Sequence, residues 1–160
     1  MTASCCMLAP HSYVLLSTDA DSDTPLNAFD EALRARGVAN FNFIGVSSIL
    51  PRYCRQAPLS EVRDIQEGSF MYCVMSRIES DTPGATISSA IACATTTSTV
   101  GCVAEFNGHC SGTEAEREAI RRARAMVASR DAEVESIEVT SATHVVKQCG
   151  CSVSLCLLLY

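Results

Sequence analysis

The residues best suited to do chemistry are Ser47 and Ser48, an adjacent pair at the end of an expected strand and shortly before Pro51. A serine hydroxyl can attack the carbonyl of the residue before it, which converts that amide into an ester. Elimination from the ester leaves a reactive carbonyl group at a new amino terminus. The pair is therefore either an ordinary strand end or a self-processing site that makes its own cofactor.

A second polar residue, Asn42, lies on the same expected strand as the serines. Alternation along residues 40–48 places Asn42 and Ser48 on one face, together with Ile44 and Val46. Six residues of extended strand span roughly 20 Å. Asn42 therefore meets Ser48 only if the chain bends near Ser47 or if the partner residue comes from another subunit.

A third polar residue, Glu105, falls in an expected strand over residues 100–106. Alternation places it on the face of Gly101 and Val103, where a carboxylate is costly to bury. The chain has no G-x-S-x-G, P-loop, H-E-x-x-H or G-x-G-x-x-G motif to explain these three residues.

A helix is predicted over residues 25–36, begun by the hydroxyl of Thr24 and ended by Gly37. Spacing of three and four predicts that its buried stripe consists of Leu26, Phe29 and Leu33. Asp30 lies at the edge of that stripe, where its carboxylate either is solvated or lines a cleft.

The remaining elements predict an α+β fold, with one or two antiparallel or mixed sheets and helices on the outer faces. A second helix is expected after a capping box at residues 113–116, with alanines facing inward. Residues 19–25 are read as an acidic loop and residues 52–68 as a long loop. Further strands are expected at 13–17, 69–78, 86–94, 134–146 and 150–159.

Composition narrows the class of protein. The chain has 160 residues, is 48% hydrophobic and 19% charged, and carries a net charge of −6, which together predict one globular domain without a nucleic-acid surface. No apolar run is long enough to span a membrane. The ten cysteines lack zinc spacing and no signal peptide precedes them, so we expect reduced thiols, no metal and a cytoplasmic location. Residues 1–11 are expected to form a disordered tail.

The order of several blocks resembles the pyruvoyl-dependent arginine decarboxylase family across roughly residues 12–150. The blocks are Leu-Asn-Ala-Phe-Asp at 26–30, Asn-Phe-Asn-Phe at 40–43, Val-Ser-Ser-Ile-Leu-Pro at 46–51, Asp-Thr-Pro-Gly at 81–84, and Ala-Glu-Phe at 104–106. The first and third blocks together are quite specific, whereas any single block is weak.

The resemblance implies the sandwich fold of pyruvoyl-dependent histidine and arginine decarboxylases and self-cleavage between Ser47 and Ser48 into chains 1–47 and 48–160. Ser48 would become the pyruvoyl cofactor, which forms a Schiff base with arginine and releases CO2 and agmatine. Glu105 matches the proton-donating glutamate and Asn42 an active-site asparagine. Asp30 and Ser47 match substrate-binding positions, and the site is implied to form between subunits of a homotrimer.

One departure from the family leaves alternatives open. The family usually carries a second proline after the Ser-Ser-Ile-Leu-Pro run, where this chain has Arg52. The same chemistry on lysine or another amino acid, or a trimeric relative without catalysis, therefore stands beside arginine decarboxylation. A cysteine-rich metal-binding protein is a third alternative, which the poor ligand spacing disfavours.

Overall fold

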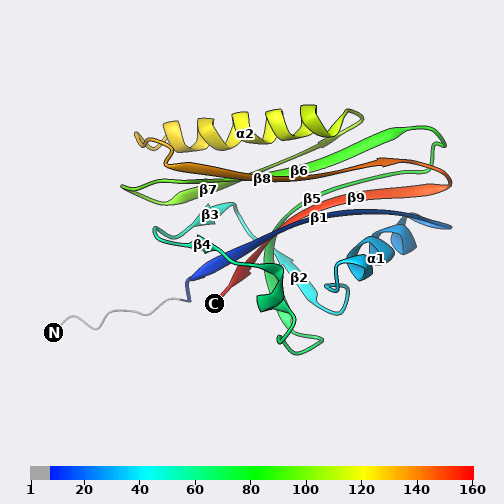
Figure 1. The fold of residues 1–160 in the computed structure, drawn as a ribbon, viewed down its shortest axis with the longest axis horizontal. Coiled ribbons are helices and arrows are strands. Elements are labelled where there is room, and N and C mark those ends of the chain that lie inside the picture. The colour runs from blue at the N-terminus through cyan, green and yellow to red at the C-terminus, as the bar shows by residue number, and fades with distance from the viewer. Residues whose placement is uncertain (1–7) are drawn as a thin grey trace.

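A computed structural model describes residues 8–160 and arranges them in four layers (Figure 1). Helix α1 covers one sheet, helix α2 covers the other, and the two sheets pack face to face between the helices. The predicted α+β sandwich with helices on its outer faces is confirmed. No helix in this part of the chain is long and apolar enough to cross a membrane.

The elements follow one another along the chain as strands, with one helix near the start and one after the middle. They are β1 (Ser12–Ser22), α1 (Pro25–Ala35), β2 (Asn42–Gly45), β3 (Ile49–Leu50), β4 (Arg55–Gln56), the 3-10 helix η1 (Leu59–Val62), β5 (Phe70–Ser80), β6 (Thr86–Thr95), β7 (Gly101–Gly108), α2 (Gly112–Ala128), β8 (Ser136–Val145) and β9 (Cys149–Leu159).

Each sheet mixes strands from distant parts of the sequence. The first sheet has the order β2-β5-β9-β1-β4, and the second has the order β3-β7-β6-β8. The β2–β5 and β1–β4 pairs are parallel, whereas the long pairs β1–β9, β5–β9, β6–β7 and β6–β8 are antiparallel. Strand β9 is buried along its whole length because α1 covers one of its faces and the second sheet covers the other.

Hydroxyl groups join the two sheets at the centre of the sandwich. Ser17 lies 2.6 Å from the hydroxyl of Thr140 and 3.0 Å from that of Ser154. The Ser89 hydroxyl lies 2.9 Å from both Ser152 and Ser154. Each hydroxyl of this network has a partner, so the network joins the two sheets without leaving any of its own hydroxyls unpaired.

The first helix is largely as predicted, but its buried face is not. The Thr24 hydroxyl accepts a hydrogen bond from the Asn27 amide (3.1 Å), and Gly37 has a positive φ of 71°. The buried residues are Ala28, Ala32 and Leu33, while Leu26 is 69% exposed. The predicted stripe was wrong at Leu26. The helix packs on the sheet through the face of Ala28 and Ala32, and Leu26 lies on a face turned away from the sheet.

Three other predictions are corrected. Strand β1 continues to Ser22, so most of the expected acidic loop is a strand. The box that begins α2 is formed by Ser111 and Glu114, two residues earlier than the predicted box. The expected loop 52–68 contains β4 and η1. The predicted tail over residues 1–11 falls partly outside the described residues; within them, the His11 amide donates to the Leu159 carbonyl (2.8 Å).

The acidic end of β1 holds a histidine from β8. Nδ1 of His144 lies 2.8 Å from Asp19, and Nε2 lies 3.0 Å from Asp21. Asp21 also accepts hydrogen bonds from the amides of Lys147 and Gln148 at 2.7 and 2.9 Å. The hydrogen bond from His144, followed by that from the Lys147 amide, lowers the pKa of Asp21 to about 2.

We expect the Asp21→Asn substitution to destabilise the protein in a pH-dependent way. Because folding lowers the pKa of this carboxyl, the ionised Asp21 stabilises the folded state at pH values above its ordinary pKa of 3.8. This stabilisation is lost as the pH falls toward about 2. The variant should therefore unfold at lower denaturant than the wild type at about pH 5, with the difference shrinking as the pH is lowered. Asp81→Asn, at an exposed turn, is the control; a pH-independent Asp21→Asn difference would contradict the assignment.

Candidate active site

Ser47 and Ser48 lie where the chain crosses from one sheet to the other. The amide of Val46 makes the last hydrogen bond to the first sheet, to the carbonyl of Cys73 (3.0 Å). The carbonyl of Ser48 makes the first bond to the second sheet, from the amide of Val103 (2.8 Å). The serine pair therefore spans the gap between two fixed backbone segments instead of ending a strand in solvent.

The backbone at Ser48 is strained. Its φ is +26°, in the left-handed region that residues other than glycine rarely adopt. Such conformations cost about 1–3 kcal/mol and persist only where the surrounding structure enforces them. Here the Ser48 amide donates to the carbonyl of Val46 (3.3 Å), and its carbonyl is held by Val103. The strain sits on the nitrogen side of the Ser47–Ser48 bond.

The carbonyl of Ser47 is in a different situation. Ser47 is exposed, and its carbonyl oxygen accepts no hydrogen bond from any residue in the range 8–160. A nucleophilic attack on this carbonyl places negative charge on its oxygen, which needs a donor for stabilisation. The described chain alone does not supply that donor.

The structure brings Glu105 close to Ser48. The antiparallel register pairs Ile49 with Cys102, which puts Ser48 opposite Val103. Glu105 lies two residues further along β7, on the same face as Val103, at a spacing of roughly 7 Å. The pairing of β3 with β7 therefore places Glu105 two residues along from the position opposite Ser48.

Glu105 is exposed, so the prediction that its carboxylate meets a buried face is wrong. It shares the face of Val103, as alternation predicted, and that face packs between the sheets at Val103. The first sheet also reaches this part of β7, since the Ser76 hydroxyl of β5 donates to the carbonyl of Phe106 (2.6 Å). Arg122 of α2 supports this end of the strand by donating from Nη1 to the Glu105 carbonyl (3.1 Å). Nothing in the sequence distinguishes Arg122 from the other arginines of α2, since an arginine on a helix usually has a solvated side chain.

Asn42 does not reach the serines of its own chain. It opens β2, pairs with Phe70, and donates from Nδ2 to the carbonyl of Gly68 (2.8 Å). Four residues of extended chain separate it from Val46, which corresponds to roughly 13 Å. The chain does bend at Ser47, which was one of the two expected ways of bringing Asn42 to Ser48. Because the bend comes after the extended segment, it does not bring Asn42 to the serines.

Asp30 is also separate from the serines. It is exposed on α1, which packs on the face of the first sheet that is turned away from the second sheet (Figure 1). Its neighbour Phe29 lies under the guanidinium of Arg77, at 3.6 Å from the ring centroid. The Asp30 carboxylate forms no ion pair or hydrogen bond with a residue in the described part of the chain, so it is free to bind a cation.

The candidate residues do not gather at one place on the chain. Ser47, Ser48 and Glu105 lie at the crossing between the sheets. Asp30 lies on α1, and Phe43, next to Asn42 in β2, packs on the α1 side of the first sheet, so alternation turns Asn42 to the opposite face. Within the described part of one chain, neither Asn42 nor Asp30 reaches the serines.

Comparison with known proteins gives a consistent assignment. A family model described as pyruvoyl-dependent arginine decarboxylase matches residues 12–160. A protein of that name from Methanothermobacter thermautotrophicus is 40% identical over 141 residues, covering 88% of this chain and 91% of the relative. Relatives of the same name from Methanocaldococcus jannaschii and Pyrococcus furiosus are 35% and 32% identical, covering 94% and 88% of this chain and 91% and 89% of their own lengths.

Proposed function

The chain belongs to the pyruvoyl-dependent arginine decarboxylase family, and we propose that it converts L-arginine to agmatine and CO2 after cleaving its own backbone between Ser47 and Ser48. Membership makes it a carboxy-lyase whose cofactor is a covalent pyruvoyl group. The observation that carries the cleavage proposal is the strained Ser48, held between two sheets with its hydroxyl next to the Ser47 carbonyl in the sequence.

The first step uses groups of the chain alone. The Ser48 hydroxyl oxygen attacks the Ser47 carbonyl carbon, and the C–N bond breaks as the proton passes to the Ser48 nitrogen. The ester that results loses its carboxylate by β-elimination, which ends the short chain at Ser47. Water then replaces the nitrogen on the former Ser48, so that ammonia leaves and a ketone remains. The left-handed backbone at Ser48 favours this step because cleavage releases the strain.

Once formed, the ketone at residue 48 would supply the electron-withdrawing carbonyl with which the substrate amine reacts. Glu105 is placed to handle the proton that must reach the substrate α-carbon after CO2 leaves. Its side chain lies on the face of β7 nearest Ser48, and Arg122 fixes the backbone beneath it. A carboxyl at hydrogen-bond reach of the reacting carbon is the usual general acid for such a transfer.

Binding of arginine is assigned to Asp30 and Asn42. Asp30 offers an unpaired carboxylate to the planar guanidinium, the pairing that gives the strongest charge-assisted hydrogen bonds. Asn42 offers an amide that can donate to the Ser47 carbonyl during cleavage or orient substrate afterwards. Both are proposed to come from the neighbouring protomer of a homotrimer, which supplies the donor that the Ser47 carbonyl lacks within its own chain.

We expect Asp30→Ala to raise the KM for arginine by about 10- to 100-fold, because a charge-assisted pair contributes about 1.5–3 kcal/mol. Self-cleavage should continue, since Asp30 is far from the serines. The measurement is steady-state kinetics on the processed variant. Glu31→Ala is the matched control, because Glu31 is the next exposed acid of α1 and pairs with Arg34 (2.9 Å). An unchanged KM in Asp30→Ala would remove this residue from the binding site.

Release of labelled CO2 from carboxyl-labelled L-arginine by the purified protein tests the proposed reaction directly. L-lysine, tested in parallel, separates arginine decarboxylation from the same chemistry on another cationic amino acid. Turnover with arginine well above lysine is expected, since an ammonium cannot form the two parallel bonds that a guanidinium makes with a carboxylate. Turnover with lysine alone would correct the substrate, and turnover with neither would contradict the proposal.

A further inference from the structure

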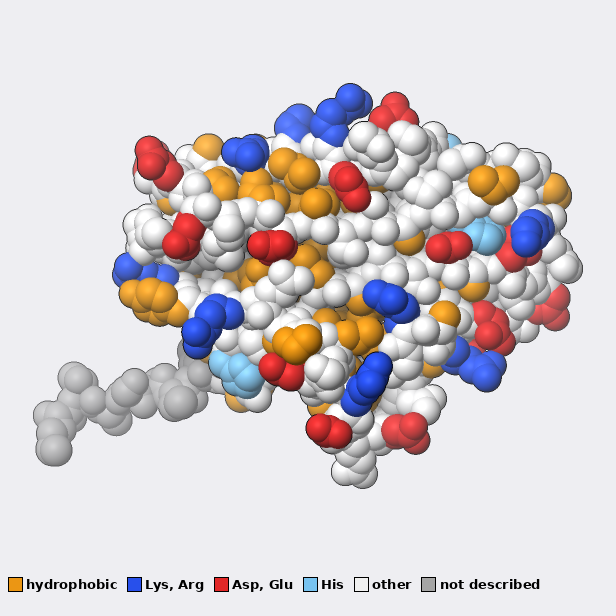
Figure 2. Space-filling view, in the orientation of Figure 1, with side chains coloured by type: hydrophobic (Ala, Val, Ile, Leu, Met, Phe, Trp, Pro, Cys, Tyr) orange, Lys and Arg blue, Asp and Glu red, His pale blue; other side chains and the backbone are white. Residues whose placement is uncertain are grey.

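A cavity of 770 Å³ opens at one end of the sandwich, between the loop after β3 and the adjoining ends of β6 and β8. None of the five proposed active-site residues lines it. Figure 2 shows apolar side chains at the surface between the two sheets, with acidic and basic side chains beside them. The volume lies within the range of roughly 300–1,000 Å³ that is typical of small-molecule sites.

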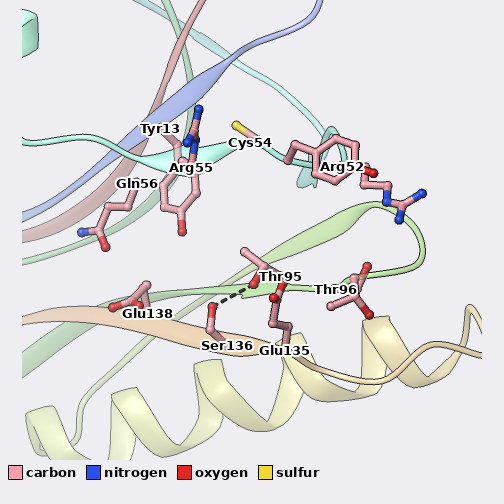
Figure 3. A pocket seen from close by; sticks show the side chains of 12 residues that line it. Tyr13, Arg52, Cys54, Arg55, Gln56, Thr95, Thr96, Glu135, Ser136 and Glu138 are labelled. Carbon is pink, nitrogen blue, oxygen red and sulfur yellow. Dashed lines mark hydrogen bonds between the residues drawn. The ribbon is translucent and has the colours of Figure 1, made fainter.

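The hydroxyl of a buried tyrosine points into this cavity. Tyr13 is 1% exposed, and Figure 3 shows its hydroxyl directed at the opposite wall. The hydroxyl makes no hydrogen bond to any residue between 8 and 160. Burial raises the pKa of Tyr13, and the nearby thiols and Glu138 add to the shift, so the phenol stays a protonated donor. The hydroxyl opens into the cavity, so it is available as a hydrogen-bond donor to a bound ligand.

The opposite wall carries acceptors. In β8, Ile137 and Val139 pack against α2, so Ser136 and Glu138 point to the space between the sheets. Thr95 of β6 lies beside them, with its hydroxyl 2.7 Å from that of Ser136. Glu135, just before β8, adds a second carboxylate to the lining. The Tyr13 hydroxyl therefore faces a wall of negative and neutral acceptors.

Positive charge lies at the other end of the cavity. Figure 3 shows Arg52 and Glu138 at opposite ends, with Tyr13 between them. The guanidinium of Arg52 stacks over the ring of Tyr53, 4.7 Å from the centroid, which holds it at the rim. The guanidinium of Arg55 is turned away from the Glu138 wall. The charges of the lining are thus separated along the cavity and are not paired with one another.

We propose that this cavity is a second binding site, for a small zwitterion of the amino-acid class. Its cationic end lies at Glu138, its carboxylate lies at Arg52, and the Tyr13 hydroxyl bonds to it between these ends. Both charge types in the lining, together with the unpaired phenol, are then satisfied by one molecule. The proposal is independent of the catalytic assignment, because it uses none of the same side chains.

The test is calorimetric titration of L-arginine into the full-length Asp30→Ala/Ser48→Ala double variant. This background stays unprocessed and lacks the proposed guanidinium partner, so arginine is neither consumed nor bound at the catalytic position. One equivalent per chain is expected to bind. Agmatine, which differs only by the lost carboxylate, should bind about tenfold more weakly because it forgoes a charge-assisted bond to Arg52.

Single changes in the same background locate the site. Glu138→Gln and Tyr13→Phe should each weaken arginine binding by about tenfold, as expected for a lost charged or buried hydrogen bond. Glu133→Gln, an exposed acid outside the lining, and Arg55→Gln should leave it unchanged. Melting curves confirm that each variant is folded. The absence of binding, agmatine binding as tight as that of arginine, or binding insensitive to Glu138→Gln would overturn the proposal.

Discussion

Replacement of Ser48 by alanine is expected to leave the chain uncut and to abolish decarboxylation at the same time. The methyl group cannot attack the Ser47 carbonyl, so no ester forms and no ketone can arise from residue 48. The substitution removes one oxygen from a half-buried position, so the fold should persist. Gel electrophoresis reports the uncut chain, and release of CO2 from arginine reports activity.

The matched control is Ser47→Ala. The group attacked at residue 47 is a backbone carbonyl, so this variant keeps both the nucleophile and its target and should still be cut. Cleavage in Ser48→Ala, or activity without cleavage, would show that the carbonyl cofactor does not come from Ser48. Loss of cleavage in both variants would instead indicate that cleavage depends on the backbone conformation of the segment that crosses between the sheets.

Replacement of Glu105 by glutamine is expected to separate processing from turnover. Cleavage needs the Ser48 hydroxyl and a strained backbone, neither of which depends on this carboxyl. Protonation of the substrate α-carbon does depend on it, and loss of a general acid typically costs about 10²- to 10⁴-fold in rate. We therefore expect a normally processed protein with kcat reduced by that factor and KM little changed, measured by steady-state kinetics.

Asn107→Ala is the control for this substitution. Asn107 lies two residues along β7, on the same face and equally exposed, but further from Ser48. Its loss should leave kcat close to that of the wild type. Normal turnover in Glu105→Gln, or an equal loss in Asn107→Ala, would remove Glu105 from its proposed role.

Local signals in the sequence predicted the elements well. The Thr24 hydroxyl and Gly37 delimit α1 because a cap and a left-handed stop act within a few residues of the chain. The run of small and apolar residues that begins at Thr86 is strand β6. The first sheet covers one face of this strand and α2 covers the other. The alanines expected to face inward on α2 are buried.

The features that shape the site depend on contacts distant in sequence and were not predictable in this way. Alternation assigned Ser48 to a face but could not show that residues 49 and 50 pair with β7 in another sheet. The hydrogen bond between His144 and Asp21 joins positions 123 residues apart. The acidic stretch that was predicted to be a loop is therefore part of a strand.

The most direct test of the central claim is the intact mass of the purified wild-type protein. We predict two polypeptides that break between Ser47 and Ser48, one of residues 1–47 and one of residues 48–160, with the longer lacking a free amino terminus and carrying the mass of a pyruvoyl group. A single chain of 17.1 kDa that remains whole after purification and releases no CO2 from arginine would contradict the account.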